Sequence, residues 1–185
     1  MPAVPTAQTE PPAPDPREID PAFLALPLRQ AADAALQASQ DLDVDYAALR
    51  VMRLRSRDVS LRDARLEGSH DGDDIGLSVR VLHEGTWGFA AGVDVTPDEA
   101  ARLARQAVDV ARVASRMSTE RVELADEPVY PDATWISAYD IDPFMVPAAD
   151  SVALLAAWSA DLLAADGVDH VTASLRQVLE NTFYA

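Results

Sequence analysis

The clearest alternation of apolar and polar positions lies between residues 74 and 92. Such alternation has the two-residue period of a strand with one buried face. It is interrupted by Glu84-Gly85, a pair suited to a tight hairpin turn. The stretch therefore predicts two antiparallel strands, and we assign Val79, Val81 and Phe89 to their shared buried face.

Apolar residues at helical spacing predict two helices before residue 120. A stripe of leucine and alanine predicts a helix over residues 28–39. A second helix is predicted over residues 97–116, where Thr96 can act as the N-cap. Pro97 suits the first helical position, and Glu99 completes a capping box. We expect the alanine-rich stripe of this helix to pack against the buried face of the hairpin.

A third helix is predicted over residues 151–165, with Gly167 as its C-terminal stop. We expect its large apolar residues to form a buried face, and Trp135 also to lie in the core. These large residues are Leu154, Leu155, Trp158, Leu162 and Leu163.

Shorter patterns predict the remaining strands. Residues 44–66 indicate two strands joined by a turn near Ser56-Arg57, the first an inner strand and the second a more polar edge strand. Residues 68–73 are predicted to be a loop. A short strand is expected around residues 121–124 and a final strand over residues 170–183.

These elements predict an α+β fold, a two-layer sandwich with a mostly antiparallel sheet and long helices on one face. Residues 21–185 are expected to form this domain, and residues 1–20 a disordered, proline-rich tail. The chain stops on Phe183-Tyr184-Ala185, inside a predicted strand. We therefore expect the gene to continue past Ala185 and the chain to be cut before a further domain.

The charge and composition of the chain limit the classes of molecule that it can bind directly. The formal net charge is −16 and every cation is an arginine. Such acidity repels phosphate backbones, so we expect no direct nucleic-acid partner. The chain has no cysteine, which excludes disulfides and thiolate metal ligands. No apolar run approaches the length of a membrane span and no signal peptide is evident, so we expect no membrane partner and a cytoplasmic location.

His83-Glu84 forms the first half of the motif found in many zinc proteases. Such a site needs a second histidine one helical turn further on, because that spacing directs two imidazoles at one metal ion. Thr86, Trp87 and Gly88 occupy those positions, and the pair lies in a predicted hairpin. We therefore interpret His83 as a residue beside the turn and Glu84 as solvated. The other histidines, His70 and His170, lie on separate predicted elements and form no ligand set with His83.

The remaining candidates also lack the pattern that chemistry requires. Residues 71–74 resemble half of a calcium loop but lack the later oxygen ligands, so a solvated acidic turn is the preferred interpretation. Gly85, Gly88 and Gly92 precede no helix directly and indicate turns and close packing rather than a phosphate cradle. No nucleophile elbow is present. We accordingly assign no catalytic, cofactor-binding or metal-binding residue to this chain.

The segment from residue 71 to 112 resembles the TldD/PmbA family of bacterial metallopeptidases. That family carries a G-x-x-V-R-V strand, a turn, a W/T-G-F-A strand and an alanine-rich helix with an acidic or Thr-Pro cap. An opening D-Y/A-x-x-R pattern is matched at residues 45–50 with one extra residue of spacing, and the resemblance extends over roughly residues 25–185. The matching residues are Gly76, Val79, Arg80, Val81, Trp87, Gly88, Phe89, Ala90 and the run from Thr96 to Arg112.

The resemblance implies a two-domain cytosolic protein whose first domain is a two-layer α+β fold. The zinc site of the family, a His-Glu-x-x-x-His motif with a later cysteine, lies downstream of this region. Zinc is therefore expected in the full-length protein and not in this chain. The resemblance further implies a dimer with a second family subunit or with itself, which cleaves unfolded peptides in a closed cavity during peptide maturation or antitoxin degradation.

Two hypotheses of different classes follow. In the first, the chain is the non-catalytic N-terminal domain of a TldD-like zinc metallopeptidase and is inactive alone. In the second, it is a self-standing acidic α+β interaction module with a partner-binding edge strand. An older family label, modulator of DNA gyrase, is compatible with a protein partner but not with direct DNA contact.

Overall fold

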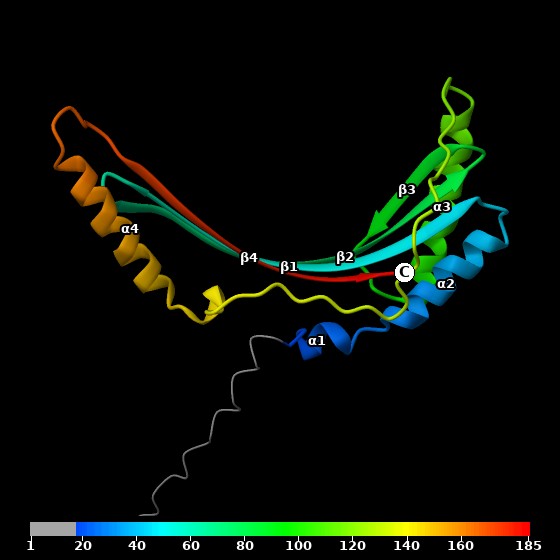
Figure 1. Cartoon of the computed structure of the whole chain (residues 1–185), viewed down its shortest axis with the longest axis horizontal. Coiled ribbons are helices and arrows are strands. Elements are labelled where there is room, and N and C mark those ends of the chain that lie inside the picture. The colour runs from blue at the N-terminus through cyan, green and yellow to red at the C-terminus, as the bar shows by residue number, and fades with distance from the viewer. Residues whose placement is uncertain (1–17) are drawn as a thin grey trace, which may run out of the picture.

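The computed structural model describes residues 18–185, so most of the predicted tail over residues 1–20 lies outside the described residues. Figure 1 shows a long, curved sheet with helices packed near its two ends. The elements in order are α1 (Pro21–Leu24), α2 (Leu28–Gln40), β1 (Tyr46–Arg62), β2 (Arg65–His83), β3 (Thr86–Gly92), α3 (Pro97–Ser115), the 3-10 turn η1 (Pro143–Met145), α4 (Ala148–Leu163) and β4 (Thr172–Tyr184).

The sheet confirms the predicted α+β class. Its four strands have the order β3-β2-β1-β4, and every neighbouring pair is antiparallel. β1 has 17 residues and β2 has 19, so the two form a hairpin that runs the whole length of the sheet. β3 covers only the end of β2 nearest His83, while β4 follows β1 to its far end.

The predicted turn at Ser56-Arg57 is wrong, and so is the loop at residues 68–73. Both stretches belong to the long hairpin, where Ser56 pairs with Gly72 and Arg57 with Asp71. The chain reverses instead at Asp63 and Ala64, which have φ angles of 50° and 61°. Polar pairs across the sheet therefore continue both strands through positions where composition alone indicates a break. Residues 58–62 of the predicted second strand belong to β1, which is paired on both sides, so the expected edge position is wrong for them.

The main core lies where α2 and α3 pack on the β3 end of the sheet, as Figure 1 shows. Both helices confirm the sequence prediction, and the Thr96 hydroxyl accepts a hydrogen bond from the Glu99 amide at 3.2 Å. Small residues allow the layers to approach closely. The most buried alanines of the two helices are Ala31, Ala35, Ala100, Ala104, Ala107 and Ala111.

Phe89 does not share the buried face of Val79 and Val81. The hairpin turns at Glu84-Gly85 as predicted, but its register pairs Phe89 with Arg80 and pairs Val79 with Ala90. Phe89 therefore lies on the face away from α3 and is 57% exposed, whereas Val79 and Val81 are buried. A two-residue turn fixes this register, because a shift of one position sends each side chain to the opposite face.

The far end of the sheet has a much smaller core. Leu155 of α4 packs with Val59 and Leu61 of β1, and these three make up the buried part of this cluster. The predicted buried face of α4 is wrong for its largest residues, since Leu154, Trp158 and Leu162 are about half exposed. Trp135, expected in the core, is 84% exposed.

A polar stretch of β1 separates the two cores. Arg53 binds Asp20 and Asp73 at 2.8 and 2.7 Å, and Arg57 binds Asp71 at 2.9 Å. The guanidinium of Arg57 also donates to the carbonyl of Val146, in the segment that passes over this part of the sheet before α4. The strand predicted at residues 121–124 is wrong, because this stretch has an irregular backbone. Its one contact of strand type is the hydrogen bond that the Val122 amide donates to the Gly85 carbonyl at 2.8 Å.

Candidate functional site

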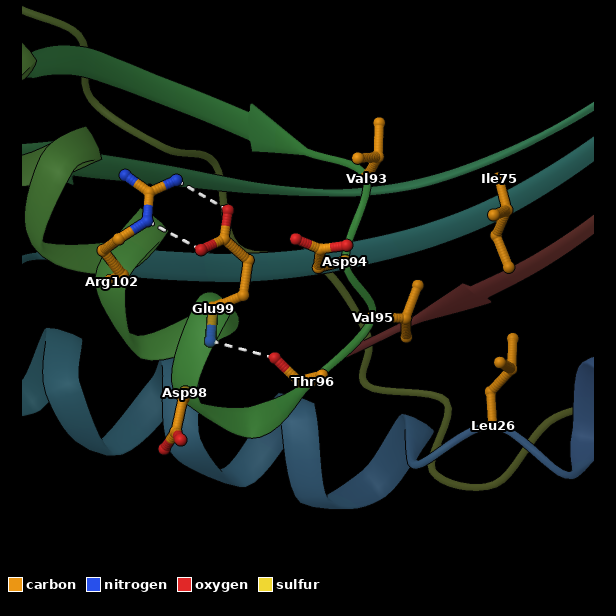
Figure 2. A pocket seen from close by; sticks show the side chains of 9 residues that line it. All are labelled: Leu26, Ile75, Val93, Asp94, Val95, Thr96, Asp98, Glu99 and Arg102. Atoms are coloured by element: carbon orange, nitrogen blue, oxygen red, sulfur yellow. Dashed lines mark hydrogen bonds and ion pairs between the residues drawn. The ribbon is translucent and has the colours of Figure 1, made fainter.

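A pocket of about 530 Å³ lies beside the N-terminus of α3, at the point where β3 ends. Figure 2 shows its apolar and polar residues on opposite sides. Its apolar lining comes from Leu26, Ile75, Val93 and Val95. Its polar lining comes from Asp94, Thr96, Asp98, Glu99 and Arg102.

The carboxylate of Glu99 forms an ion pair with Arg102. Arg102 donates to its two oxygens at 2.6 and 2.7 Å, and this pairing holds the pKa of Glu99 below its ordinary value. Gly92 makes room for the pair, because a side-chain carbon at that position would lie 2.5 Å from a Glu99 oxygen. A paired carboxylate with a lowered pKa is a poor general base at neutral pH. The pocket can therefore hold an apolar group beside an acidic rim, but it lacks a catalytic arrangement.

The structure keeps the three histidines on different parts of the chain. His83 ends β2, where its Nδ1 lies 3.2 Å from the carbonyl of Asp43, and Glu84 adopts a positive φ in the turn. His170 lies at the other end of the long hairpin, with Nδ1 3.0 Å from an Asp63 oxygen. His70 lies within β2, which puts it roughly 40 Å along the strand from His83.

The side chains of residues 18–185 that could bind a metal are not gathered around one point. No group of three or more histidine, aspartate and glutamate side chains among them is placed to hold a metal. The acidic run at residues 71–74 lies in β2 rather than in a turn, and its Asp71 and Asp73 pair with Arg57 and Arg53. These carboxylates neutralise neighbouring guanidinium groups and stabilise the hairpin. The three glycines of the hairpin have the predicted packing roles, since Gly88 leaves no space for a side chain beside Ala107.

Sequence reasoning missed a cluster of aromatic residues around Arg80, on the sheet face away from α3. The guanidinium of Arg80 lies 4.5 Å from the ring centre of Trp87 and 6.0 Å from that of Tyr46. The hydroxyls of Tyr46 and Tyr184 are 2.6 Å apart, and burial together with this contact raises the pKa of Tyr184. Only the cross-strand register could have revealed this cluster. Its residues come from four strands and become neighbours only when β1 pairs with β2 and β4, and β2 with β3.

Comparisons with known proteins agree with this fold. The family model described as PmbA/TldA metallopeptidase domain 1 matches residues 47–111. A metalloprotease of Methanocaldococcus jannaschii is 30% identical over 82 residues, which is 44% of this chain and 18% of that protein. No helix within residues 18–185 combines the length and apolar character needed to cross a membrane.

Solved structures share the architecture. A candidate modulator of DNA gyrase from Bacteroides thetaiotaomicron superposes with a TM-score of 0.64 at 15% identity, over 85% of this chain and 36% of that one. A candidate modulator of DNA gyrase from Thermotoga maritima gives 0.57 at 12% identity, over 85% and 34%. TldE from Thermococcus kodakarensis gives 0.50 at 14% identity, over 84% and 36%.

The chain thus spans about a third of each solved relative and less than a fifth of the curated metalloprotease. The family-model match covers the stretch that contains most of the long hairpin, β3 and α3. The chain is therefore similar to the PmbA/TldA metallopeptidase family over residues 47–111, which match the first domain of that family, and it shares the fold of the solved structures.

Proposed function

We propose that this chain is the non-catalytic first domain of a zinc metallopeptidase subunit that cleaves unfolded peptides inside a dimer. The observation that carries the proposal is the match of residues 47–111 to the first domain of the family. In this proposal the zinc ligands belong to a downstream domain, and the first domain contributes partner contacts and cavity wall.

The chemistry of the described residues favours a non-catalytic role for this domain. The carboxylates nearest the pocket are either exposed or paired with Arg102. Two of the three histidines, His83 and His170, contact Asp43 and Asp63 respectively rather than each other. Hydrolysis of an amide at neutral pH needs a polarised carbonyl and an activated water. In a metallopeptidase both depend on a metal held by about three protein ligands, with one position left open.

A fluorescence-quenched, unstructured peptide tests the proposal. We expect no turnover by the 185-residue chain, with or without added zinc. The chain extended by its downstream domain should bind zinc stoichiometrically, and turnover should then require the partner subunit as well. Isothermal titration with zinc provides a second readout that does not depend on activity.

Chelator-sensitive turnover by the 185-residue chain alone would contradict the proposal. Alanine substitutions of His70, His83 and His170, tested one at a time, would then locate the ligands. Failure of the extended chain to bind zinc would instead favour the alternative function, an acidic interaction module that acts through its sheet edges.

A further inference from the structure

The helices of residues 18–185 all pack on one side of the sheet. The residues that β1 contributes to the two helical clusters are odd-numbered, namely Leu49, Val51, Val59 and Leu61. Figure 1 shows these helices on the outer side of the curved sheet. Because side chains alternate along a strand, the even-numbered residues of β1 lie on the concave side, which we call the inner face. The aromatic cluster around Arg80 belongs to this face, at its β3 end.

The inner face has a small apolar layer of its own at this end. Leu82 is buried, and the register places it opposite both Tyr46 and Trp87. The rings of Tyr46 and Trp87 meet edge to face, with their centres 5.9 Å apart, and so cover Leu82. Phe89 lies beside this layer and is 57% exposed. Packing within residues 18–185 therefore accounts for Tyr46 and Trp87 but not for Phe89.

Arg80 is a cation with no carboxylate partner in the described part of the chain. None of the ion pairs within residues 18–185 includes it, and its guanidinium lies instead over the ring of Trp87. The neighbouring arginine on this face, Arg50, is already paired with Glu180 at 2.8 Å. Arg80 also interacts with the Tyr184 hydroxyl, but a guanidinium has five N–H donors. Stacking on a ring leaves the donors at the guanidinium edge available to an anion.

Phe89 lies directly opposite Arg80 on the neighbouring strand. The side chains of such cross-strand neighbours begin about 5 Å apart. This spacing suits the last residue of a peptide, in which a carboxylate and a side chain leave the same carbon atom. The carboxylate can accept two hydrogen bonds from Arg80, while a large apolar side chain packs on the exposed ring of Phe89.

A nucleic acid fits this surface less well. Bases can stack on exposed aromatic rings, but the phosphates of the same strand would approach a chain of net charge −16. A peptide carries a single terminal carboxylate, so one arginine without a carboxylate partner is enough to neutralise it. The charge of the chain therefore favours the end of a peptide over a strand of DNA or RNA.

We propose that the inner face at the β3 end binds the C-terminal residue of a peptide, with Arg80 holding the free carboxylate and Phe89 contacting a large apolar side chain. The inference rests on the proposed function, in which this domain forms the wall of a space where unfolded peptides are cleaved. It adds which end of the peptide the domain holds and which side chains hold it.

Fluorescence anisotropy with a labelled glycine-serine peptide that ends in a free phenylalanine tests the site. We expect saturable binding to the 185-residue chain and to the chain extended by its downstream domain. The same peptide with a C-terminal amide should bind at least about tenfold more weakly, a change of about 1.4 kcal/mol. Equal binding of the two peptides, or no saturable binding, would overturn the proposal. Binding by the 185-residue chain alone would overturn it for the longer protein.

An arginine substitution tests the role of the charge. Arg80→Met keeps an apolar stem over Trp87 but removes the guanidinium, so it should bind the free and amidated peptides equally weakly. Arg176→Met is the matched control. It removes the same charge from the same face, but Arg176 lies opposite Asp58 and is roughly 30 Å along β1 from Arg80. Equal losses in both variants would mean a general charge effect and would overturn the site.

A second substitution tests the apolar contact. Phe89→Ala should weaken binding of the peptide that ends in phenylalanine severalfold, and it should leave a peptide that ends in glycine unchanged. Because Phe89 is exposed, this variant should fold normally, and circular dichroism checks this for every variant. Unchanged binding of both peptides would show that Phe89 contacts no ligand side chain and would overturn the proposed contact.

The three tryptophan indoles provide a readout that a merely structural role of Arg80 would not move. Trp87 lies beside the proposed site, whereas Trp135 lies in the segment before α4 and Trp158 on the outer side of α4. In nuclear magnetic resonance spectra, the peptide should shift the indole N–H signal of Trp87 alone. Shifts confined to the other two indoles would overturn the site. A single-stranded oligonucleotide that shifts Trp87 where the peptide does not would assign this face to nucleic acid instead.

These results separate the inference from the proposed function. The binding assays contain no zinc and measure no turnover, so binding that depends on the free carboxylate supports the site even if the extended chain proves inactive. Conversely, an active extended protein that binds free and amidated peptides equally well would refute the site and leave the metallopeptidase role standing.

Discussion

The two ends of the sheet are built from the same strands but are packed very differently (Figure 1). At the β3 end, two helices cover one face of the sheet, and the core includes Leu49, Val81 and Leu103 with no exposed surface. At the far end a single helix, α4, covers the sheet through a buried cluster centred on Leu155. Hydrophobic stabilisation scales with the apolar area removed from water, so the free energy of unfolding should be concentrated at the β3 end.

This difference in packing leads us to expect that the α4 end opens locally at a lower cost in free energy than the β3 end. Local opening requires the least free energy where few apolar contacts are buried. The α4 end has few, and the part of the sheet between the two ends has main-chain ladders and the ion pairs of Arg53 and Arg57 but, within residues 18–185, no apolar core. We therefore expect α4 to exchange its amide hydrogens faster than α3.

The largest expected effect is at the β3 end. Val81→Asp would bury an unpaired carboxylate in a fully buried position and should cost several kcal/mol, enough to unfold a marginal domain. Thermal melting followed by circular dichroism measures this. Phe89→Asp is the matched control, because Phe89 lies on the neighbouring strand but on the exposed face, and its melting temperature should change little. Equal losses in both variants would contradict the register of the hairpin.

The second effect comes from close packing between β3 and α3. A side-chain carbon at Gly88 would overlap the Ala107 carbonyl and would lie 2.9 Å from the Ala111 side chain. Gly88→Ala should therefore push α3 from the sheet and cost about 3 kcal/mol. Gly68→Ala is the control in β2, where the nearest atom is the mobile Ser60 hydroxyl at 3.2 Å. Urea unfolding compares the two variants, and similar midpoints would argue against the α3 contact.

The third effect should remain at the far end. Leu155→Ala removes the helix side chain that meets Val59 and Leu61, and we expect it to cost about 2 kcal/mol locally. Hydrogen exchange should show lost protection in α4 and in the start of β4, with α3 unchanged. The matching change at the β3 end, Leu103→Ala, should lower protection throughout the domain. A global loss in Leu155→Ala would mean that the two ends unfold as one unit.

The fourth effect should be close to zero. Trp158 is 56% exposed on the outer side of α4, so Trp158→Ser should change the free energy of unfolding by less than about 0.5 kcal/mol. Chemical denaturation of the 185-residue chain measures this. A loss comparable to that of Leu155→Ala would show that the large residues of α4 are buried after all.

The same contrast explains which predictions from sequence succeeded. In α3 the apolar stripe is narrow and its other faces are charged, so periodicity identified the buried side correctly. In α4 apolar residues occur all round the helix, and the face that meets the sheet holds Ser151, Leu155 and Ser159. The Ser159 hydroxyl bonds the Leu155 carbonyl at 2.8 Å, which allows a small polar residue to be buried there. Residue size alone therefore indicated the wrong face.

The length of the central hairpin could not be predicted from local patterns. Glycine and aspartate at residues 71–73 usually mark turns, yet here they lie opposite residues 55–57 of β1. Arginines of β1 supply the compensating contacts, since Arg57 pairs with Asp71 and Arg53 pairs with Asp73. Those contacts depend on residues 14 or more positions away along the chain. The aromatic cluster around Arg80 was missed for the same reason, whereas the family resemblance depended on the local pattern of one hairpin and one helix.

The smallest expected effect is a pH response at the far end, and it centres on Asp63 in the hairpin turn. One carboxylate oxygen accepts the Val171 amide at 2.9 Å, and the other lies 3.0 Å from the His170 ring. These contacts, the Val171 bond first, hold the pKa of Asp63 below its ordinary value. Because the folded pKa is the lower one, the ionised group stabilises the fold fully above the unfolded pKa of about 3.9.

This stabilisation is lost as the pH falls through the folded pKa, and since Asp63 joins the turn to the start of β4, the loss should appear at the α4 end. We expect the protection of the α4 amides against hydrogen exchange, relative to the intrinsic rate at each pH, to fall below about pH 4, before the protection of α3 falls. Other ion pairs also titrate in acid, so the comparison must isolate Asp63. Asp63→Asn keeps an oxygen for the Val171 amide but carries no charge, and it should flatten the pH dependence of α4 alone. If α4 follows the same pH profile in both proteins, the anchoring role of Asp63 is wrong and the weakness of this end reflects its small apolar cluster only.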